Sequence, residues 1–154
     1  MTATHSNFIA GTWVDGGTAI ENRNPSDLSD LIGTFAQATS SQLDDALEAA
    51  RRAQVEWAAY GLERKQAVLM NIGTEMMARA EELGVLLSRE EGKPLAEGKG
   101  EVYRAGQFFT YYAAEVLRQL GENADSVRPG VEVDVRREPV GVVAIISPWN
   151  FPTA

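Results

Sequence analysis

The sequence contains no cysteine and only one histidine, His5, which lies close to the amino terminus. A chain without cysteine can form no disulfide, no thiolate metal site and no thiol nucleophile. A histidine in an expected terminal tail is a poor candidate for a general base, and we predict no metal site. The residues of this chain are therefore expected to contribute to chemistry through groups other than thiols and imidazoles.

Long hydrophobic runs and basic residues are also scarce. No apolar stretch is long enough to span a bilayer, and the first residues lack the basic start and apolar core of a secretory signal. The 14 lysines and arginines are outnumbered by 22 aspartates and glutamates, which gives a formal net charge of -8 at pH 7. This balance argues against binding to nucleic acids or anionic membranes, which require a basic surface. We therefore expect a cytoplasmic protein. Because 44% of the 154 residues are hydrophobic, we also expect a sizeable core.

Two glycine–lysine pairs suggest a phosphate-binding loop, but their surroundings exclude it. The pairs are Gly92 with Lys93 and Gly98 with Lys99. A phosphate loop needs a serine or threonine after the lysine and a buried strand before the loop, so that backbone amides can surround the phosphates. Pro94 and Gly100 follow the lysines here, and the preceding pattern is helical. We therefore predict no phosphate loop at either pair.

Two β-hairpins are predicted near the amino terminus. Residues 8–17 place short apolar runs on either side of glycines and end on Asp-Gly-Gly, a composition typical of hairpins. Residues 19–25 and 31–36 form two further short strands on either side of a turn at residues 25–27, where proline, serine and aspartate favour a change of direction. The first part of the chain is therefore expected to be built from short strands.

Four helical segments are predicted between residues 40 and 121. A serine cap, with an acidic residue three positions after Ser41, opens the first helix, and Gly61 ends it. A second helix follows, and a third short helix ends at Gly92. Residues 95–121 then place apolar side chains on one broad face, although three internal glycines weaken this helix locally.

The most informative segment is residues 139–152, which reads Pro-Val-Gly-Val-Val-Ala-Ile-Ile-Ser-Pro-Trp-Asn-Phe-Pro. Residues 140–146 form a continuous apolar run rich in β-branched residues, the pattern of a strand buried on both faces in a parallel sheet. Residues 147–152, which we call the asparagine loop after Asn150, cannot continue the ladder because their two prolines fix φ and lack a backbone donor. In α/β folds, cofactors and substrates bind where such strands end.

This segment resembles the opening of the cofactor-binding site in the NAD(P)-dependent aldehyde dehydrogenase superfamily. The resemblance is carried by Pro139, Val140, Gly141, Val142 and Val143, followed by Ile146, Ser147, Pro148, Trp149, Asn150, Phe151 and Pro152. It extends more weakly to the amino-terminal strands and to residues 90–94, which in this family connect helices and carry no chemistry. The structural alternative is that Trp149 and Phe151 only fill a core while Asn150 forms a turn. This alternative explains the composition of the segment but not the order of its residues.

The resemblance implies a catalytic role for Asn150, whose side-chain amide would help to form an oxyanion hole for the substrate carbonyl oxygen. It also implies a site for NAD or NADP. The implied cofactor-binding residues are Ile146, Ser147, Pro148, Trp149 and Asn150. The family reaction further requires a cysteine nucleophile and a glutamate base, and neither can be assigned here. We therefore interpret the chain as the amino-terminal part of a longer enzyme and expect it to be inactive by itself.

The expected fold class is α/β, as the amino-terminal part of an aldehyde-dehydrogenase-like fold. Short β-hairpins and helices at residues 1–123 would lead into the first strand of a Rossmann-like parallel sheet at residues 139–154. Between them, residues 124–138 include an alternating run of apolar and charged residues at 131–137, which is typical of a strand with one face in water. In the resembled family this region is a β-projection for subunit association, so the resemblance implies a homo-oligomer. The catalytic domain is absent from these residues.

The implied function is oxidation of a small aldehyde to a carboxylate through a cysteine thioester. The overall character is similar to that of bacterial enzymes that oxidise small carboxylated semialdehydes, such as 2-oxoglutarate semialdehyde or succinate semialdehyde. Two non-catalytic alternatives stay open: a self-contained helical interaction module, and a regulatory truncation that joins full-length subunits through the strand at residues 131–137. The choice between NAD and NADP also stays open, because the residue that binds the ribose is expected downstream.

Overall fold

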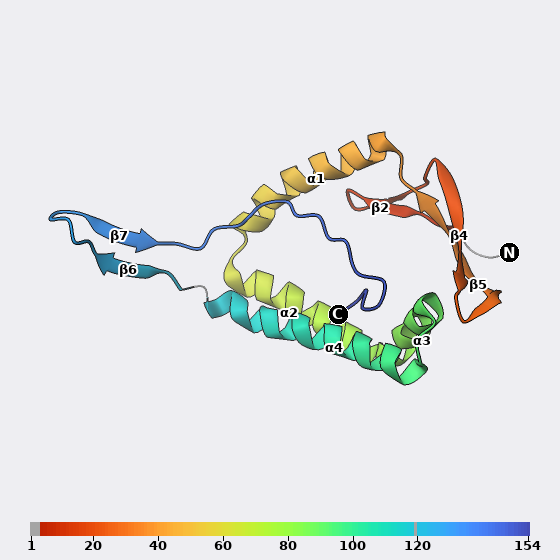
Figure 1. The fold of residues 1–154 in the computed structure, drawn as a ribbon. Helices are drawn as coiled ribbons and strands as arrows, with labels where there is room; N and C mark the ends of the chain where they lie inside the picture. Colours follow the sequence, from red (N-terminus) through yellow and green to blue (C-terminus); the bar gives the residue numbers. More distant parts are fainter. Residues whose placement is uncertain (1–3, 119) are drawn as a thin grey trace.

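The computed structural model describes residues 4–118 and 120–154, in which short strands flank four consecutive helices (Figure 1). The first strands are β1 (Thr4–His5), β2 (Asn7–Ile9), β3 (Thr12–Val14), β4 (Thr18–Asn24) and β5 (Asp27–Gln37). The helices are α1 (Ser40–Ala59), α2 (Leu62–Ala78), α3 (Ala80–Glu91) and α4 (Leu95–Glu115), which a 3-10 turn, η1 (Val116–Arg118), extends. The last strands are β6 (Glu122–Asp125) and β7 (Glu132–Val135). Residues 136–154, which we call the tail, contain no helix or strand.

Both predicted amino-terminal hairpins are confirmed. β5 lies at the centre of a three-stranded sheet, antiparallel to β4 and parallel to β1. β2 and β3 form a separate antiparallel hairpin in which Ile9 faces Thr12 across the turn. The two turn residues, Ala10 and Gly11, have φ values of 52° and 82°. Positive φ at both positions is the requirement of a type I′ turn, the two-residue turn that suits the twist of a hairpin.

The helices form close to their predicted limits, but the first helix is capped by a different residue. The Thr39 side chain accepts a hydrogen bond from the Gln42 backbone N–H, and the Gln42 side chain accepts one from the Thr39 N–H. The predicted cap at Ser41 is therefore wrong, since Ser41 lies inside the helix. Thr39 is the cap because a glutamine, which can complete a capping box, stands three residues after it. α3 is followed, as predicted, by Gly92, whose φ of 75° lies in the left-handed region. None of the helices described has the length and apolar character that crossing a bilayer requires.

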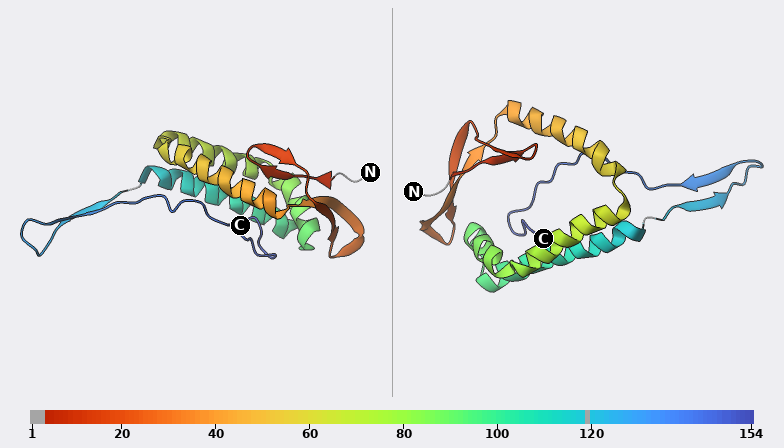
Figure 2. Two further views of the ribbon diagram at one scale, coloured as in Figure 1. Left: turned by 90° about the horizontal axis from the view of Figure 1, so that it is seen from above. Right: turned by 180° about the vertical axis from the view of Figure 1, so that it is seen from behind.

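Helix α4 packs against α2 and α3, and these contacts contain the small buried core (Figure 2). The buried hydrophobic residues are Leu87, Val102, Ala105 and Ala113. Glycines face each other where the helices meet. A Cβ atom built on Gly106 would lie 2.7 Å from the Gly73 carbonyl oxygen of α2, and one built on Gly98 would lie 2.7 Å from the Gly84 carbonyl oxygen of α3. These glycines lower the intrinsic helix propensity of α4 but allow its backbone to approach both neighbours.

An ion pair joins the amino-terminal sheet to α3. Arg89 Nε and Nη2 donate to the two carboxylate oxygens of Asp30 at 2.8 and 2.6 Å. The hydrogen bonds from Arg89 lower the pKa of Asp30 to about 2, from an ordinary value of 3.8. Ser26, in the turn between β4 and β5, donates from Oγ to the Gly92 carbonyl oxygen at 2.9 Å. The sheet is therefore attached at the end of α3, next to the connection that leads into α4.

Strands β6 and β7 form an antiparallel hairpin that projects away from the helices (Figure 1). Every residue of both strands is exposed. The strand predicted at residues 131–137 is confirmed in its central part, and its partner begins at Glu122, slightly before the predicted start of the β-projection at residue 124. The role of this hairpin in subunit association stays a prediction.

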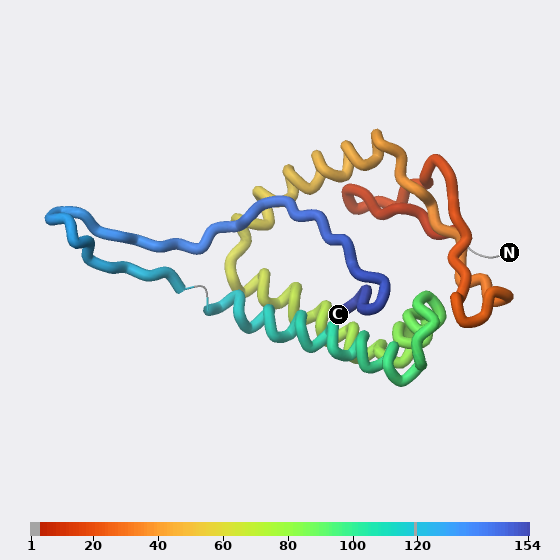
Figure 3. Tube along the Cα trace, in the orientation of Figure 1, coloured from red at the N-terminus to blue at the C-terminus, as the bar shows by residue number. Residues whose placement is uncertain are grey.

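The buried parallel strand predicted at residues 140–146 is not formed. No strand pairs with these residues in the described chain, and Val140, Ile145 and Ile146 are 93%, 84% and 95% exposed. A run of β-branched residues favours extended backbone, but a ladder also needs a neighbour that supplies hydrogen-bonding partners. The tail instead runs back from the hairpin and ends against α4, as Figure 3 shows.

The glycine contacts of α4 can be tested by substitution. Gly106→Ala should lower the free energy of unfolding by about 1–3 kcal/mol, because the added methyl group overpacks the contact with α2. Its built Cβ atom lies 2.6 Å from Met77 Cγ and 2.7 Å from the Gly73 carbonyl oxygen. Urea unfolding followed by circular dichroism measures the change.

Gly100→Ala is the matched control in the same helix. Gly100 is exposed and has no atom within 4 Å of a built Cβ, so the change should raise the free energy of unfolding by about 0.8–1 kcal/mol through helix propensity alone. Stabilisation by both substitutions would show that the glycines do not set the distance between the helices.

Candidate functional site

The tail ends at a cluster of charged groups around the connection between α3 and α4. Lys93 lies in this connection, and Glu101 lies on the second turn of α4. Lys93 Nζ donates to Glu91 Oε2 at 2.8 Å, to the Glu101 carboxylate and to the carbonyl oxygen of Asn150 at 3.0 Å. These three acceptors match the three N–H donors of an ammonium group. We call Glu91, Lys93 and Glu101 the anchor cluster.

Glu101 attaches the anchor cluster to the residues after the asparagine loop. Its Oε1 atom accepts hydrogen bonds from the Thr153 backbone N–H at 2.9 Å and from the Thr153 hydroxyl at 2.8 Å, while its Oε2 atom accepts from Lys93. The Glu101 side chain is 1% exposed and the Lys93 side chain 11%. A carboxylate this deeply buried is stable as an anion only when its oxygens have such partners.

Burial and charge act in opposite directions on the pKa of both residues. Burial by itself would lower the pKa of Lys93 and raise that of Glu101, because it disfavours the charged forms. The hydrogen bonds and charges of Glu101 and Glu91 outweigh burial and raise the pKa of Lys93. The hydrogen bonds from Lys93 and Thr153 likewise outweigh burial and lower the pKa of Glu101. Both groups are therefore charged at neutral pH and attract each other where little water screens them.

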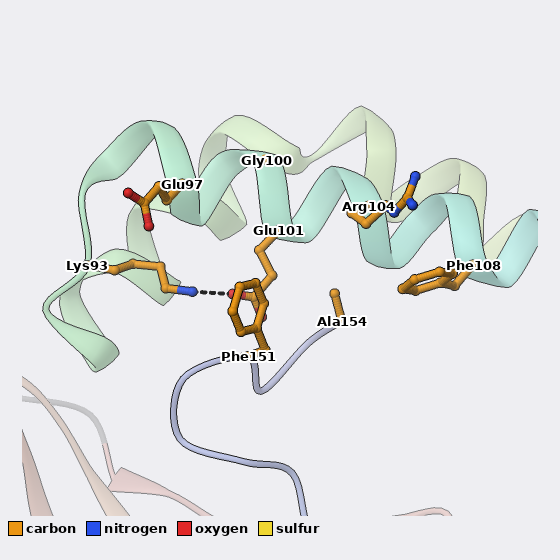
Figure 4. Close-up of a pocket in the computed structure, with 8 residues that line it drawn as sticks. All are labelled: Lys93, Glu97, Gly100, Glu101, Arg104, Phe108, Phe151 and Ala154. Atoms are coloured by element: carbon orange, nitrogen blue, oxygen red, sulfur yellow. Dashed lines mark hydrogen bonds and ion pairs between the residues drawn. The ribbon is translucent and has the colours of Figure 1, made fainter.

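An aromatic ring from the asparagine loop lies against the anchor cluster. Lys93 Nζ is 4.4 Å from the centroid of the Phe151 ring, which is within the range of a cation–π contact. Phe151 also borders a cavity of about 420 Å³ between α4 and the end of the tail (Figure 4). The cavity is lined by Lys93, Glu97, Gly100, Glu101, Arg104, Phe108, Phe151 and Ala154. Cavities of this size accept small organic ligands.

Arg104 is the second cation of the cavity and, unlike Lys93, has no acidic partner in the described part of the chain. Its Nη1 atom donates to Gln107 Oε1 at 3.3 Å, and its guanidinium carbon lies 5.2 Å from the centroid of the Phe108 ring. In Figure 4, Arg104 and Phe108 follow one another along α4, beyond Glu101. A guanidinium without an acidic partner can bind a carboxylate through two parallel hydrogen bonds.

The structure divides the predicted site residues into two groups. Asn150 lies at the anchor cluster, which binds its backbone carbonyl oxygen. Ile146, Ser147, Pro148 and Trp149 precede Asn150 and are exposed, Ile146 by 95% and Trp149 by 87%. Their predicted contacts with a dinucleotide and the predicted role of the Asn150 side chain stay predictions. Within residues 4–118 and 120–154, no three His, Cys, Asp or Glu side chains are grouped as metal ligands.

No chemistry was predicted for residues 90–94, and Glu101 was not among the predicted site residues. One signal could have identified the glutamate: it stands on the core-facing stripe of α4, beside Val102 and four residues before Ala105, which are both 1% exposed. A carboxylate on such a stripe requires a cationic partner. The sequence offers both Lys93 and Lys99, and only the structure shows that Lys99 pairs with Glu81 of α3 instead.

Comparisons with known proteins extend the resemblance over almost the whole chain. The sequence matches the family described as "Aldehyde dehydrogenase family" over residues 13–154. An alpha-ketoglutaric semialdehyde dehydrogenase of Bacillus subtilis (strain 168) is 38% identical over 154 residues, which cover 98% of this chain and 31% of that protein. A succinate-semialdehyde dehydrogenase (NADP(+)) of Escherichia coli (strain K12) is 35% identical over 149 residues, which cover 96% of this chain and 31% of that protein.

Solved structures show the same arrangement of elements. The crystal structure of an NAD-dependent aldehyde dehydrogenase from Sinorhizobium meliloti superimposes with a TM-score of 0.90 at 29% identity, and the match covers 99% of this chain and 31% of that chain. This chain therefore spans about a third of the length of the proteins that it matches, with 31% covered in each case. The strands, helices and projecting hairpin described above together correspond to one part of a larger fold.

The anchor cluster makes a prediction about stability. Lys93→Met should lower the free energy of unfolding by about 3–5 kcal/mol, because it leaves the Glu101 carboxylate buried without its cation. The neutral-anchor variant, which combines Lys93→Met with Glu91→Gln and Glu101→Gln, should recover most of this loss. No buried charge then remains, and the amide introduced at position 101 can still accept a hydrogen bond from Thr153. Urea unfolding of both variants measures the difference, and equal stability of the two would contradict a buried ion pair.

Proposed function

Because this chain belongs to the aldehyde dehydrogenase family, we propose that it forms part of an enzyme that oxidises an aldehyde to a carboxylate with NAD or NADP. The observation that carries this proposal is the asparagine loop, whose Asn150 is bound to a buried charge cluster beside a cavity of ligand size. The sequence contains no cysteine, so a thiol nucleophile must come from residues outside it. In the proposed reaction, the residues of this chain bind the cofactor and the substrate, orient them, and stabilise the negative charge that develops.

Asn150 is the proposed catalytic residue of this chain. Attack on an aldehyde concentrates negative charge on the carbonyl oxygen, and a fixed N–H donor stabilises that charge more than it stabilises the starting carbonyl. Lys93 binds the Asn150 backbone oxygen, which supports a fixed backbone at this residue before substrate binds. The side-chain amide of Asn150 would then donate to the substrate oxygen.

Ile146, Ser147, Pro148, Trp149 and Asn150 are the residues proposed to hold the cofactor. The exposed apolar surfaces of Ile146 and Trp149 suit packing against the flat ring and ribose of a nicotinamide nucleotide. Residues 140–146 also have backbone N–H and C=O groups that no strand of the described residues pairs with. When bound, NAD or NADP accepts the hydride. The relatives include an NADP(+) enzyme and an NAD-dependent one, which supports a nicotinamide cofactor here.

The proposed substrate is a small aldehyde that carries a carboxylate, as in the semialdehydes named for the two relatives above. Arg104 supports this choice because it lines the same cavity as Phe151 and its guanidinium has no acidic partner in residues 4–118 and 120–154. Lys93, the other cation of the cavity, is already bound by Glu91 and Glu101.

The activity itself is the first test. The protein produced from its complete natural reading frame should reduce NAD or NADP in the presence of small aldehydes, and Asn150→Ala should lower kcat by about 100- to 1000-fold. Absorbance of the reduced cofactor measures the rate. Asn71→Ala, an exposed asparagine on α2, should leave kcat unchanged. A protein that reduces neither cofactor with any aldehyde would overturn the proposed function.

Arg104 allows a test of the substrate class. Arg104→Met should raise KM for succinate semialdehyde by about 10- to 100-fold, because a charge-assisted hydrogen bond contributes about 1.5–3 kcal/mol. KM for butanal, which lacks the carboxylate, should stay within about two-fold by the same argument. Steady-state kinetics with both aldehydes separates the two effects. An equal rise for both would indicate a structural effect and contradict carboxylate recognition by Arg104.

A further inference from the structure

We propose that Lys93 and Glu101 are positioning residues that orient the Asn150 amide by binding the backbone at and after Asn150. This inference rests on the proposed function. It assigns a role to the connection between α3 and α4, for which the resemblance implied no chemistry. Residues 147–152 form no helix or strand, so the loop has no ladder of backbone hydrogen bonds to hold it in place. Its position therefore depends on side-chain contacts from outside the loop.

The contacts of the anchor cluster fall at Asn150 and on the residues directly after it. Lys93 binds the Asn150 carbonyl oxygen at 3.0 Å and lies 4.4 Å from the Phe151 ring centroid. Glu101 binds the Thr153 backbone N–H at 2.9 Å and its hydroxyl at 2.8 Å. The prolines at positions 148 and 152 have a fixed φ. The two prolines and these contacts together reduce the conformational freedom of the backbone around Asn150.

Helix ends and packing contacts in turn fix the anchor cluster. Lys93 directly follows Gly92, the left-handed residue at the end of α3, and the Gly92 carbonyl oxygen accepts a hydrogen bond from Ser26 of the sheet. Glu101 is buried on α4, beside the buried Val102 and one turn after Gly98, which contacts α3. The loop is therefore attached to rigid elements, which hold a catalytic geometry better than a loop can hold it alone.

An oxyanion donor stabilises the transition state only if it is in place before the charge develops. A misplacement of about 1 Å can cost about 100-fold in rate. The anchor cluster should therefore influence kcat through Asn150 and through no other group. This dependence distinguishes a positioning role from a contribution to folding alone.

A double-mutant cycle tests this dependence in the protein produced from its complete reading frame. The neutral-anchor variant (Lys93→Met, Glu91→Gln and Glu101→Gln) should lower kcat by about 10- to 100-fold. In an Asn150→Ala background the same three changes should alter kcat by less than about two-fold, because the donor that they orient is already missing. Equal losses in both backgrounds would overturn the proposal.

Hydrogen exchange gives a second readout that does not need activity. Mass spectrometry of peptides covering residues 147–154 should show faster amide exchange in the neutral-anchor variant than in the wild type. The control combines Lys99→Met with Glu81→Gln, which removes a second lysine–glutamate pair between α3 and α4 that does not bind the tail. This control should leave both the exchange and kcat unchanged. Unchanged exchange in the neutral-anchor variant would overturn the attachment of the loop.

The two readouts separate failure of the inference from failure of the proposed function. A wild-type protein that oxidises no aldehyde would overturn the proposed function and, with it, the catalytic role of the anchor cluster. An active wild-type protein with additive effects in the cycle would overturn the positioning role and leave the proposed function intact. Non-additive loss of kcat together with faster exchange of residues 147–154 would support both.

Discussion

The arrangement around the asparagine loop depends on the buried ion pair between Lys93 and Glu101. It joins three segments that are distant in sequence: the end of α3, the face of α4 and the end of the tail. Desolvation opposes such a pair, so it persists only where further hydrogen bonds satisfy the remaining donors and oxygens. Asn150 and Thr153 supply those hydrogen bonds. The loop therefore completes the ion pair at the same time as the ion pair holds the loop.

This pair also depends on how closely α3 and α4 approach each other. Gly84 and Gly98 remove the side chains that would separate the two helices, and Gly98 lies one turn before Glu101. Gly84 lowers the stability of α3, and Gly98 that of α4, when each is considered as an isolated helix. Their contribution becomes visible only when the partner helix is present, because a close backbone approach is a property of two elements. Tertiary packing, and not local propensity, explains the composition of α4.

The sequence predicted the structure where turn chemistry and periodicity determine it. It did not predict the structure where contacts with other segments determine it. The helix stop at Gly92, the amino-terminal hairpins and the strand within residues 131–137 follow from turn chemistry and periodicity, and all of them form. The run at residues 140–146 favours extended backbone, but its pattern cannot supply the neighbour that a ladder needs. The choice of Lys93 over Lys99 as the partner of Glu101 was likewise hidden, because both lysines belong to equivalent glycine–lysine pairs in the sequence.

The contrast between the asparagine loop and the residues before it indicates how the proposed site divides its tasks. Ile146 is 95% exposed, whereas four residues later the Asn150 carbonyl is bound by Lys93. The loop is positioned by contacts within this chain, but the apolar run requires a partner on its faces and edges. The oxyanion donor would therefore take its position from the helices, while Ile146, the proposed cofactor-binding residue that precedes the loop, would take its position from a sheet. Changes in the sheet could then alter cofactor binding without moving Asn150, since the anchor cluster lies on the helical side of the loop.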